Sequence, residues 1–393
     1  MPPKKIRATL IRELKRSRDE HRRLSDKLAR TREKLEKRVR KLRTLEAEMA
    51  TLERGISAPE GTPRVRRRVV KRDLRSAVLI YNPESTGNTS RAHSLKTILE
   101  KLVAHGIRAK TNTDTSGRSA RAFAKAAVQS GESLVIVAGG DGTIEAVSSQ
   151  LVGSQATLGI IPAGSANNLA RSLGVPLDVD EACALIGAGS TRQVDVGHIL
   201  GEKKAEAKYF LETAGLGLTA IAIPAGQAVR KNRLLGLPQA LLKLFDSKSE
   251  AVEVILDDGR SISANSQLVT VSNAPLMGRN FLLAPSAKMD DGLLDVAVYD
   301  GMGKTELLAH FVAIRDGKRL DDARIAFYQS RSVKIQASIA EPLGEDQAAL
   351  GDARNVEIEV IPHALTIVVG EGFGLQFPIE TLQSIPVPAG PVA

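Results

Sequence analysis

The chain has 393 residues, of which 42% are hydrophobic, so it is long enough to form two domains with sizeable cores and an extension. Only 3% of the residues are aromatic and none is Trp, which argues against binding nucleic acid by stacking bases on aromatic rings. The single cysteine, Cys183, excludes an internal disulfide and a cysteine-based zinc cluster, and the net charge of +10 directs attention to anionic partners.

The N-terminal extension is strongly basic. Residues 1–72 contain 25 Lys and Arg against 10 Asp and Glu, whereas the rest of the chain has a small excess of acidic residues. Leucines recur at heptad spacing between Leu10 and Leu52, with neither Pro nor Gly between them, which predicts a coiled coil over residues 1–56 and favours a parallel homodimer. A single solvated helix that docks on the chain's own second part, the predicted folded core, explains the same pattern. A basic linker over residues 57–74 follows, and such a segment attracts anionic lipid headgroups or nucleic acid.

Strands and helices alternate after this linker. Strands are expected at 76–82, near 107–112, at 133–138 and at 157–161, and helices at about 90–104, 117–130, 143–152 and 166–173. The alternation predicts a parallel, doubly wound α/β sheet over residues 75–193.

After residue 193 the order of elements changes, and the expected strands are separated mostly by turns. They are expected at 194–200, 208–213, 251–256, 261–271, 294–299, 332–337, 356–361 and 365–369. We therefore expect an antiparallel, β-sandwich-like second domain over residues 194–375, followed by a C-terminal tail over 376–393.

The most informative junction is the sequence Gly-Gly-Asp-Gly-Thr at residues 139–143, directly after the apolar run 134–138. Glycines let backbone N–H groups approach phosphate oxygens, and the carboxylate of Asp141 can hold a phosphate-bound Mg²⁺ directly or through water. A helix that begins near Thr143 would point its positive end at the same place. A tight corner between a strand and a helix would use the same glycines, so the pentapeptide alone does not decide.

Two further loops follow apolar strands, at residues 82–87 and 162–168. In an open parallel sheet, ligands bind at the carboxyl ends of the strands, so the three loops can converge on one cleft. For the second loop the simpler alternative is a cap for the next helix, supplied by Ser165 or Asn167. Capping and binding are compatible.

Four segments in this order, 82–85, 139–143, 162–171 and 285–295, resemble the diacylglycerol kinase-like lipid kinases. That family includes bacterial lipid kinases, sphingosine kinases and eukaryotic diacylglycerol kinases, and the resemblance covers roughly residues 75 to 375. It implies transfer of the γ-phosphoryl group of ATP, with Mg²⁺, to a hydroxyl of a diacylglycerol-like lipid at the membrane surface. It also makes lipid the favoured partner of the basic extension, and nucleic acid the disfavoured one.

The resemblance also implies site residues. The nucleotide-binding set comprises Asn82, Pro83, Glu84, Ser85, Thr86, Gly87, Thr113, Gly139, Gly140, Asp141, Gly142, Thr143 and Ser165. Ser165 stands where the family usually has Thr and keeps a hydroxyl. In the second domain, Asp291 resembles the ligand of a structural Mg²⁺, together with the backbone carbonyls of Lys288 and Leu293. A plain Asp-Gly hairpin turn is the simpler alternative there.

The chain departs from the family at the expected catalytic base. Many members carry Asp-Gly-Glu before the last strands, and the corresponding residues here are Asp346, Gln347 and Ala348. Alanine therefore occupies the place of the glutamate that would take the proton from the lipid hydroxyl. The catalytic candidates are then Asp141 together with Asp346 and Glu345, which could substitute for the missing base, as could Asp352. Phosphoryl transfer depends mostly on positioning and charge stabilisation, so the loss of a base need not abolish it.

Two alternatives remain open. A nucleotide-binding regulatory or scaffold protein with impaired turnover, acting through its coiled coil, is supported by Ala348. A soluble-substrate enzyme such as an NAD kinase or a phosphofructokinase shares the Gly-Gly-Asp-Gly-Thr sequence, but the segments at 82–83 and 290–295 argue against it.

No stretch approaches the roughly 18 apolar residues that span a bilayer, and the N-terminus lacks the apolar core of a signal peptide. We expect a cytoplasmic protein that associates peripherally with the inner membrane face. No motif encodes the shape of the lipid pocket, so the sequence does not indicate which lipid is used.

Overall fold

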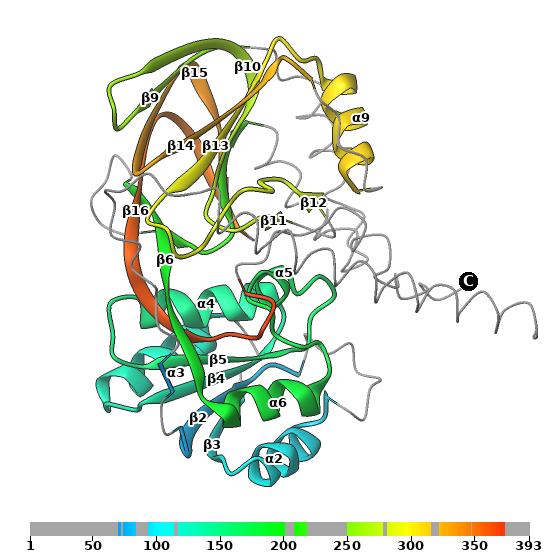
Figure 1. The fold of residues 1–393 in the computed structure, drawn as a ribbon. Coiled ribbons are helices and arrows are strands. Elements are labelled where there is room, and N and C mark those ends of the chain that lie inside the picture. The colour runs from blue at the N-terminus through cyan, green and yellow to red at the C-terminus, as the bar shows by residue number, and fades with distance from the viewer. Residues whose placement is uncertain are drawn as a thin grey trace, which may run out of the picture. The chain divides into compact units, whose positions relative to one another are not determined.

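The computed structural model describes residues 70–71, 74–83, 93–113, 117–200, 208–217, 250–277, 281–315, 322–346 and 348–373 (Figure 1). The expected coiled coil over 1–56, most of the linker and the tail over 376–393 lie outside the described residues. Among the described helices, none combines the length and the hydropathy that a membrane span requires.

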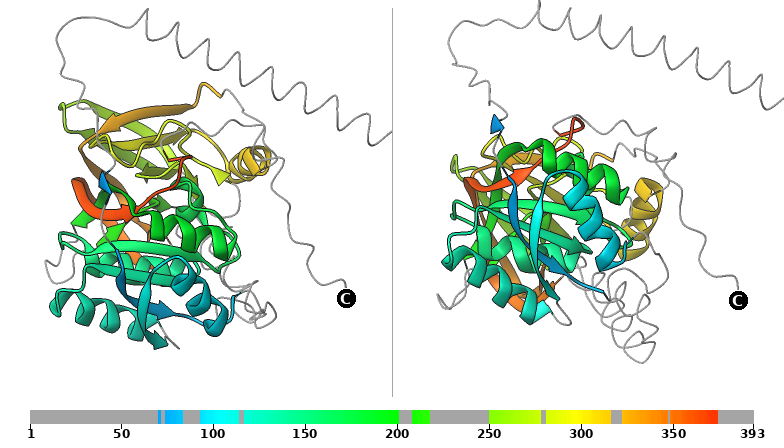
Figure 2. Two further views of the ribbon diagram at one scale, coloured as in Figure 1. Left: turned by 60° about the horizontal axis from the view of Figure 1, so that its bottom comes forward. Right: turned by 90° about the horizontal axis from the view of Figure 1, so that it is seen from below.

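The first half is a parallel sheet with helices on both faces, as the alternation of elements predicted (Figures 1 and 2). Its strands lie in the order β3, β2, β4, β5, and β4 and β5 are buried along their whole length, which is typical of strands covered on both sides. The strands are β2 (Ser76–Tyr81), β3 (Arg108–Thr113), β4 (Leu134–Gly139) and β5 (Thr157–Pro162). The helices are α2 (Leu95–Ala104), α3 (Gly117–Gln129), α4 (Asp141–Leu151), α5 (Asn168–Ser172) and α6 (Val179–Ala188).

Two hydrophobic clusters cover the two faces of this sheet, because neighbouring residues of a strand point to opposite sides. In β2, Ile80 packs into the cluster that contains side chains of α3 and α4. Its neighbour Leu79 packs into the cluster that contains side chains of α2 and α6, including the buried Cys183. Helices α3 and α4 therefore bury their apolar faces against one side of the sheet, and α2 and α6 bury theirs against the other.

The second half is built from antiparallel strands around a third hydrophobic cluster. The strands lie in the order β14, β13, β10, β8, β15, β16, and β9 pairs with both β10 and β15. Helix α9 and strand β14 were not expected from the sequence. The elements are β7 (Lys208–Phe210), β8 (Thr213–Gly217), β9 (Glu250–Leu256), β10 (Ser261–Ser272), β11 (Leu276–Met277), β12 (Phe281–Leu282), β13 (Leu294–Asp300), α9 (Lys304–Arg315), β14 (Ile325–Ser330), β15 (Ser332–Glu345) and β16 (Ala348–Val368).

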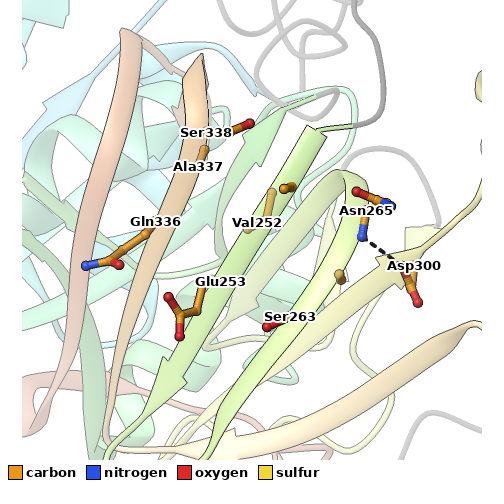
Figure 3. A pocket seen from close by; sticks show the side chains of 10 residues that line it. Val252, Glu253, Ser263, Asn265, Asp300, Gln336, Ala337 and Ser338 are labelled. Carbon is orange, nitrogen blue, oxygen red and sulfur yellow. Dashed lines mark hydrogen bonds between the residues drawn. The ribbon is translucent and has the colours of Figure 1, made fainter.

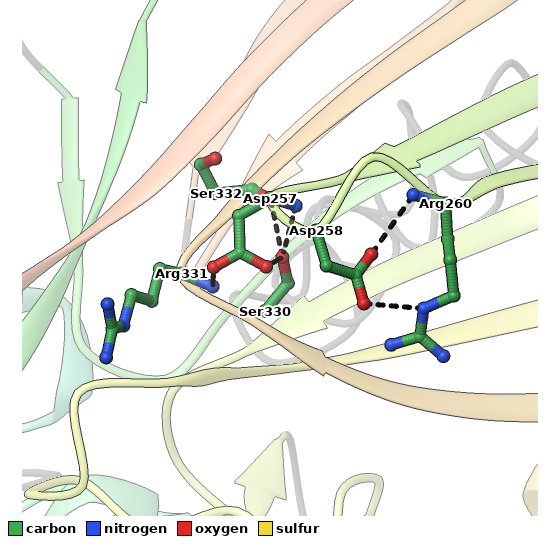
Figure 4. Close-up of polar contacts among 6 residues, drawn as sticks. All are labelled: Asp257, Asp258, Arg260, Ser330, Arg331 and Ser332. Carbon is green, nitrogen blue, oxygen red and sulfur yellow. Dashed lines mark hydrogen bonds and ion pairs between the residues drawn. The ribbon is translucent and has the colours of Figure 1, made fainter.

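One polar cluster fixes the turns of this half to each other (Figure 4). Asp257, directly after β9, accepts hydrogen bonds from the hydroxyl of Ser330 at 2.8 Å and from the N–H of Arg331 at 3.2 Å, so the β9–β10 turn is tied to the β14–β15 turn. The neighbouring Asp258 binds the side chain of Arg260 at 2.6 Å within its own exposed turn.

Two long strands connect the halves. Strand β6 (Ser190–Leu200) runs without interruption through position 193, where the sequence suggested a domain boundary, and β1 (Val70–Lys71) pairs with its beginning. β6 pairs antiparallel with β16, and the end of β16 pairs parallel with β5 through Thr366 and Thr157. The sheet is therefore mixed and continuous across both halves rather than purely antiparallel after residue 193 (Figure 1).

The structure has one strand where the sequence predicted two, at 356–361 and 365–369. The register of the β6–β16 pair shifts between Ile361 and Leu365, and His363 has a φ of 55°. Pro362 cannot donate to the ladder, and the backbone N–H of His363 instead donates to the buried carboxylate of Asp195 at 2.8 Å. This carboxylate from β6 holds the irregular segment in the sheet.

Candidate active site

The glycine turn after β4 has the close backbone packing that its sequence suggests. Helix α4 begins at Asp141, two residues before the predicted start, because the Gly140 carbonyl accepts the N–H groups of Thr143 and Ile144. A Cβ at Gly139 would lie 2.8 Å from the Cβ of Thr143, so the position has no room for a side chain. Gly142, in contrast, is exposed and a Cβ there would meet no atom within 4 Å, so a ligand can approach the turn at this point.

Asp141 joins the glycine turn to the loop after β5. Its side-chain oxygens accept the backbone N–H groups of Asn167 at 3.1 Å and Asn168 at 2.9 Å. The side chain of Asn167 closes the same loop by exchanging hydrogen bonds with the backbone of Gly164. A Cβ at Gly164 would lie 2.6 Å from the Cα of Gly140, so the two loops touch through their backbones.

The capping alternative for this loop is wrong as far as Asn167 is concerned. Asn167 occupies the N-cap position of α5 with a φ of 53°, but its side chain makes no capping hydrogen bond and serves the loop instead. Its left-handed backbone is one of three such conformations at non-glycine residues in the described part of the chain. The loop conformation is therefore set by contacts with the glycine turn.

The loop after β2 reaches the same place. The side-chain amide of Asn82 donates to the hydroxyl of Thr143 at 2.8 Å, and its backbone N–H donates to the carbonyl of Ala138 at 3.0 Å. Thr113 ends the neighbouring strand β3, paired with Tyr81. Hydrogen bonds thus connect the beginnings of all three loops. Of the remaining expected nucleotide residues, Pro83 and Ser165 are described, whereas Glu84, Ser85, Thr86 and Gly87 lie outside the described residues.

Sequence motifs did not indicate Glu212, which lies in the short turn between β7 and β8 and is 3% exposed. Its Oε2 accepts a hydrogen bond from the side-chain amide of Asn168 at 3.1 Å, so it reaches from the second half into the nucleotide loops. Burial, followed by the charges of Asp141 and Asp346, raises the pKa of Glu212 well above that of an ordinary glutamate.

Asp346, a candidate for the catalytic base, holds the backbone of the Glu212 turn. Its carboxylate accepts the N–H groups of Leu211 at 2.8 Å, Glu212 at 2.9 Å and Thr213 at 2.8 Å. Burial raises the pKa of Asp346, and the three N–H donors oppose that rise. With its oxygens engaged by three backbone donors, this carboxylate acts as a structural clamp rather than as a base available to a substrate.

The other two residues of this region lie on the strands beside Asp346. Glu345 is paired with Ala214 of β8 on one side and with Ala348 of β16 on the other. The side chains of Glu345 and Ala348 lie outside the described residues.

The turn before β13 contains the second expected cation site. Asp291 is half-buried, and its Oδ1 accepts the N–H of Leu293 at 3.1 Å. Burial, with a contribution from the charges of Asp295 and Asp195, raises the pKa of Asp291 to about 6. A carboxyl group that is disfavoured as an anion in this way is suited to a bound cation.

In the described part of the chain, no three His, Cys, Asp or Glu side chains are arranged to hold a metal ion. A cation at Asp291 would therefore depend on one carboxylate and on backbone carbonyls such as those of Lys288 and Leu293, which is the ligand set the sequence suggested. The turn is itself fixed, because the N–H of Gly292 donates to Asp195 at 2.7 Å.

A shallow hollow of about 540 Å³ lies elsewhere in the second half, between β9, β10 and β15 (Figure 3). Its polar lining includes Glu253, Asn265, Asp300 and Gln336, and the N–H of Asn265 donates to Asp300 at 2.8 Å. It contains none of the expected site residues. The loops at the carboxyl ends of β2, β4 and β5 therefore remain the candidate active site.

Comparison with known proteins assigns both halves. Residues 76–199 match the diacylglycerol kinase catalytic domain, and residues 226–369 match the YegS C-terminal NAD kinase beta sandwich-like domain. The chain belongs to the diacylglycerol kinase-like lipid kinases. The family accounts for the order of the motifs and for the α/β half followed by a β-rich half.

Curated relatives agree with this assignment. The chain is 28% identical to the diacylglycerol kinase of Bacillus subtilis over 271 residues, covering 67% of this chain and 87% of the relative. It is 26% identical to the diacylglycerol kinase of Mycobacterium tuberculosis over 304 residues, covering 76% and 96%. A crystal structure of a diacylglycerol kinase from Bacillus anthracis, 24% identical, superimposes with a TM-score of 0.59 over 77% of this chain and 99% of that one, which shows a shared fold.

Proposed function

We propose that this protein uses ATP to phosphorylate a hydroxyl of a diacylglycerol-like lipid presented at a membrane surface. The observation that carries the proposal is the pair of hydrogen bonds from the backbone of residues 167 and 168 to Asp141. These bonds hold together the two glycine-containing loops at the carboxyl ends of β4 and β5. The names of its relatives, diacylglycerol kinases from several bacteria, support the substrate class.

The assembled loops suit the phosphates of a nucleotide. The first backbone N–H groups of α4 point out of the glycine turn, and the exposed Gly142 leaves space in front of them. The oxygens of Asp141 accept the N–H groups of Asn167 and Asn168, and a carboxylate at this turn is the kind of ligand that a phosphate-bound Mg²⁺ takes. MgATP, when bound, supplies the phosphoryl group, and the residues of the loops orient it for in-line transfer.

Membrane association and dimerisation belong to the same proposal. The basic residues of the N-terminal extension would attract anionic headgroups, and its heptads would pair two copies of the chain. The enzyme would then act from the cytoplasmic side as a peripheral protein. A second Mg²⁺ at Asp291 would have a structural rather than a catalytic role.

The test offers the purified full-length protein radiolabelled ATP, Mg²⁺ and mixed micelles that contain diacylglycerol, sphingosine, ceramide or phosphatidylglycerol. Asp141→Asn removes the charge but keeps one oxygen acceptor for the loop. Glu132→Gln is the matched control, because Glu132 precedes the first residue of β4, at the end of the strand opposite the glycine turn. We expect label in one lipid with the wild type and with Glu132→Gln, and its loss in Asp141→Asn.

A second candidate is a nucleotide-binding scaffold that has lost turnover. It is favoured by the engaged carboxylate of Asp346 and by Ala348 at the family's base position. ATP binding without label in any lipid would support the scaffold and refute the lipid kinase. Label in NAD or in a sugar phosphate would instead support a soluble-substrate kinase, the class named in the description of the C-terminal domain.

A further inference from the structure

Glu212 is the acidic side chain that connects the second half with the nucleotide loops. We propose that Glu212 accepts the proton of the acceptor hydroxyl during phosphoryl transfer and thus supplies the carboxyl group that position 348 lacks. This role rests on the proposed lipid kinase function, and the experiment below separates the two.

The position of Glu212 is fixed by the groups around its backbone. Its N–H is held by Asp346 at 2.9 Å, and its carbonyl accepts the N–H groups of Asn273 at 2.8 Å and Ala274 at 3.0 Å. Its side chain then binds Asn168, whose own N–H binds Asp141. One asparagine therefore separates the Glu212 carboxyl from the carboxylate of the glycine turn, where the phosphates are expected.

Glu212 precedes β8, which lies two strands away from the position of the missing base. Ala348 pairs with Glu345, which in turn pairs with Ala214, so two strand spacings of about 5 Å each separate Ala348 from Ala214. Glu212 precedes Ala214 by two residues in the turn that Asp346 clamps. The proposal therefore assigns to Glu212 the role of the glutamate that the family carries at position 348.

A residue bonded to the Glu212 turn carries a buried acceptor that lacks a donor within the described part of the chain. Asn273 is 1% exposed, and its amide nitrogen donates to the carbonyls of Asp195 and Leu211, both at 3.0 Å. These two bonds fix which atom is the nitrogen, and the oxygen Oδ1 is buried without a hydrogen-bond donor among the described residues. Buried acceptors of this kind require a donor, and an alcohol or a water molecule would supply it.

The donors of the Asp346 and Glu212 carboxyl groups differ. Three backbone N–H groups bind Asp346, whereas one side-chain amide binds Glu212. The charged groups that face Glu212 are Asp141 and Glu145 on α4 and Asp346 at the end of β15, and all three favour protonation of Glu212. Once ionised, such a carboxylate is a stronger base than an exposed one.

The proposed step balances as follows. The hydroxyl proton passes to the ionised carboxylate of Glu212 as the hydroxyl oxygen bonds to the γ-phosphorus. The bond between that phosphorus and the bridging oxygen breaks, and the nucleoside diphosphate leaves. The protonated Glu212 then returns its proton to solvent.

The experiment measures kcat, the KM for lipid and the Kd for ATP in the mixed-micelle assay, across pH, for wild type, Glu212→Gln and the double variant Glu212→Gln/Ala348→Glu. Glutamine keeps an oxygen for Asn168 and removes only the proton acceptor, so the melting temperature and the ATP affinity should be preserved. We expect kcat to fall at least about 100-fold in Glu212→Gln, the magnitude of a lost general base. We expect the double variant to regain at least about tenfold of this loss.

The pH profile separates a base from a structural residue. A base must be ionised, so the wild-type kcat should rise with pH through the raised pKa of Glu212, and this acidic limb should be absent in Glu212→Gln. If glutamine lowers the melting temperature, Glu212→Asp is the second variant, because it keeps a carboxylate and should keep the acidic limb at a lower kcat.

The outcomes distinguish the two proposals. A folded Glu212→Gln enzyme with kcat within about threefold of the wild type, or with an unchanged acidic limb, overturns the role of Glu212 and leaves the lipid kinase standing. Wild-type protein that binds ATP and labels no lipid overturns both.

Discussion

Removal of the Asp346 carboxylate should lower the free energy of unfolding. Asp346→Ala leaves the buried N–H groups of Leu211, Glu212 and Thr213 without an acceptor. Each unsatisfied buried donor costs about 1–3 kcal/mol, and because the three share one carboxylate we expect a combined loss of about 3–5 kcal/mol. Asp346→Asn keeps one oxygen, which at Oδ1 serves two of the three donors, so its loss should be about 1–3 kcal/mol.

Urea denaturation followed by circular dichroism measures these differences. Asp258→Ala is the matched control, because its carboxylate is about half exposed in a surface turn with Arg260, and its removal should change stability by less than about 1 kcal/mol. The reasoning fails if Asp346→Ala stays within about 1 kcal/mol of the wild type and loses lipid phosphorylation, because Asp346 would then be catalytic rather than structural.

Three further predictions concern other parts of the molecule. Gly164→Ala places a Cβ 2.6 Å from the Cα of Gly140 and should weaken ATP binding, measured by calorimetry, at least about tenfold. A Cβ in Gly142→Ala meets open space, so this variant should bind ATP more tightly than Gly164→Ala does. Equal affinities of the two variants would contradict the contact between the loops. Burial raises the pKa of Asp291 from 3.8 to about 6, so its ionisation lowers the stability of the wild type as pH rises between these values. The melting temperature of Asp291→Asn should therefore rise relative to that of the wild type over this range, and Mg²⁺ above about pH 6 should stabilise the wild type alone. Parallel curves of melting temperature against pH would refute this. Deletion of residues 1–60 should abolish dimers in analytical ultracentrifugation, and an unchanged mass would show that the coiled coil does not mediate assembly.

The local signals in the sequence located the three loops at the carboxyl ends of β2, β4 and β5. A buried strand followed by glycine, or by Asn-Pro, marks the carboxyl end of a parallel strand, and this pattern depends only on neighbouring residues. The same patterns could not show that Asp141 binds the backbone of residues 167 and 168. That contact is a property of the folded loops.

Glu212 was missed for a related reason. Its importance comes from Asn168 and Asp346, which lie 44 and 134 residues away in the chain. The one local signal was a carboxylate directly after the apolar pair Phe210 and Leu211, a place where a charged side chain is rarely buried without a partner. Strand β16 was divided in two because Pro362 interrupts its pattern, and only the distant Asp195 keeps the strand continuous.

The β6–β16 pair has a mechanical consequence for the enzyme. The parallel half pairs with one end of this two-stranded ribbon through β5, and the antiparallel half pairs with the other end through β7 and β15, so a change in the angle between the halves would bend the ribbon. Its ladder of hydrogen bonds shifts register between Ile361 and Leu365, next to the buried Asp195, and bending costs least where the ladder is interrupted. The ribbon would thus bend most easily at His363. A substitution that makes this point more rigid would slow the release of product, although it changes no reacting group.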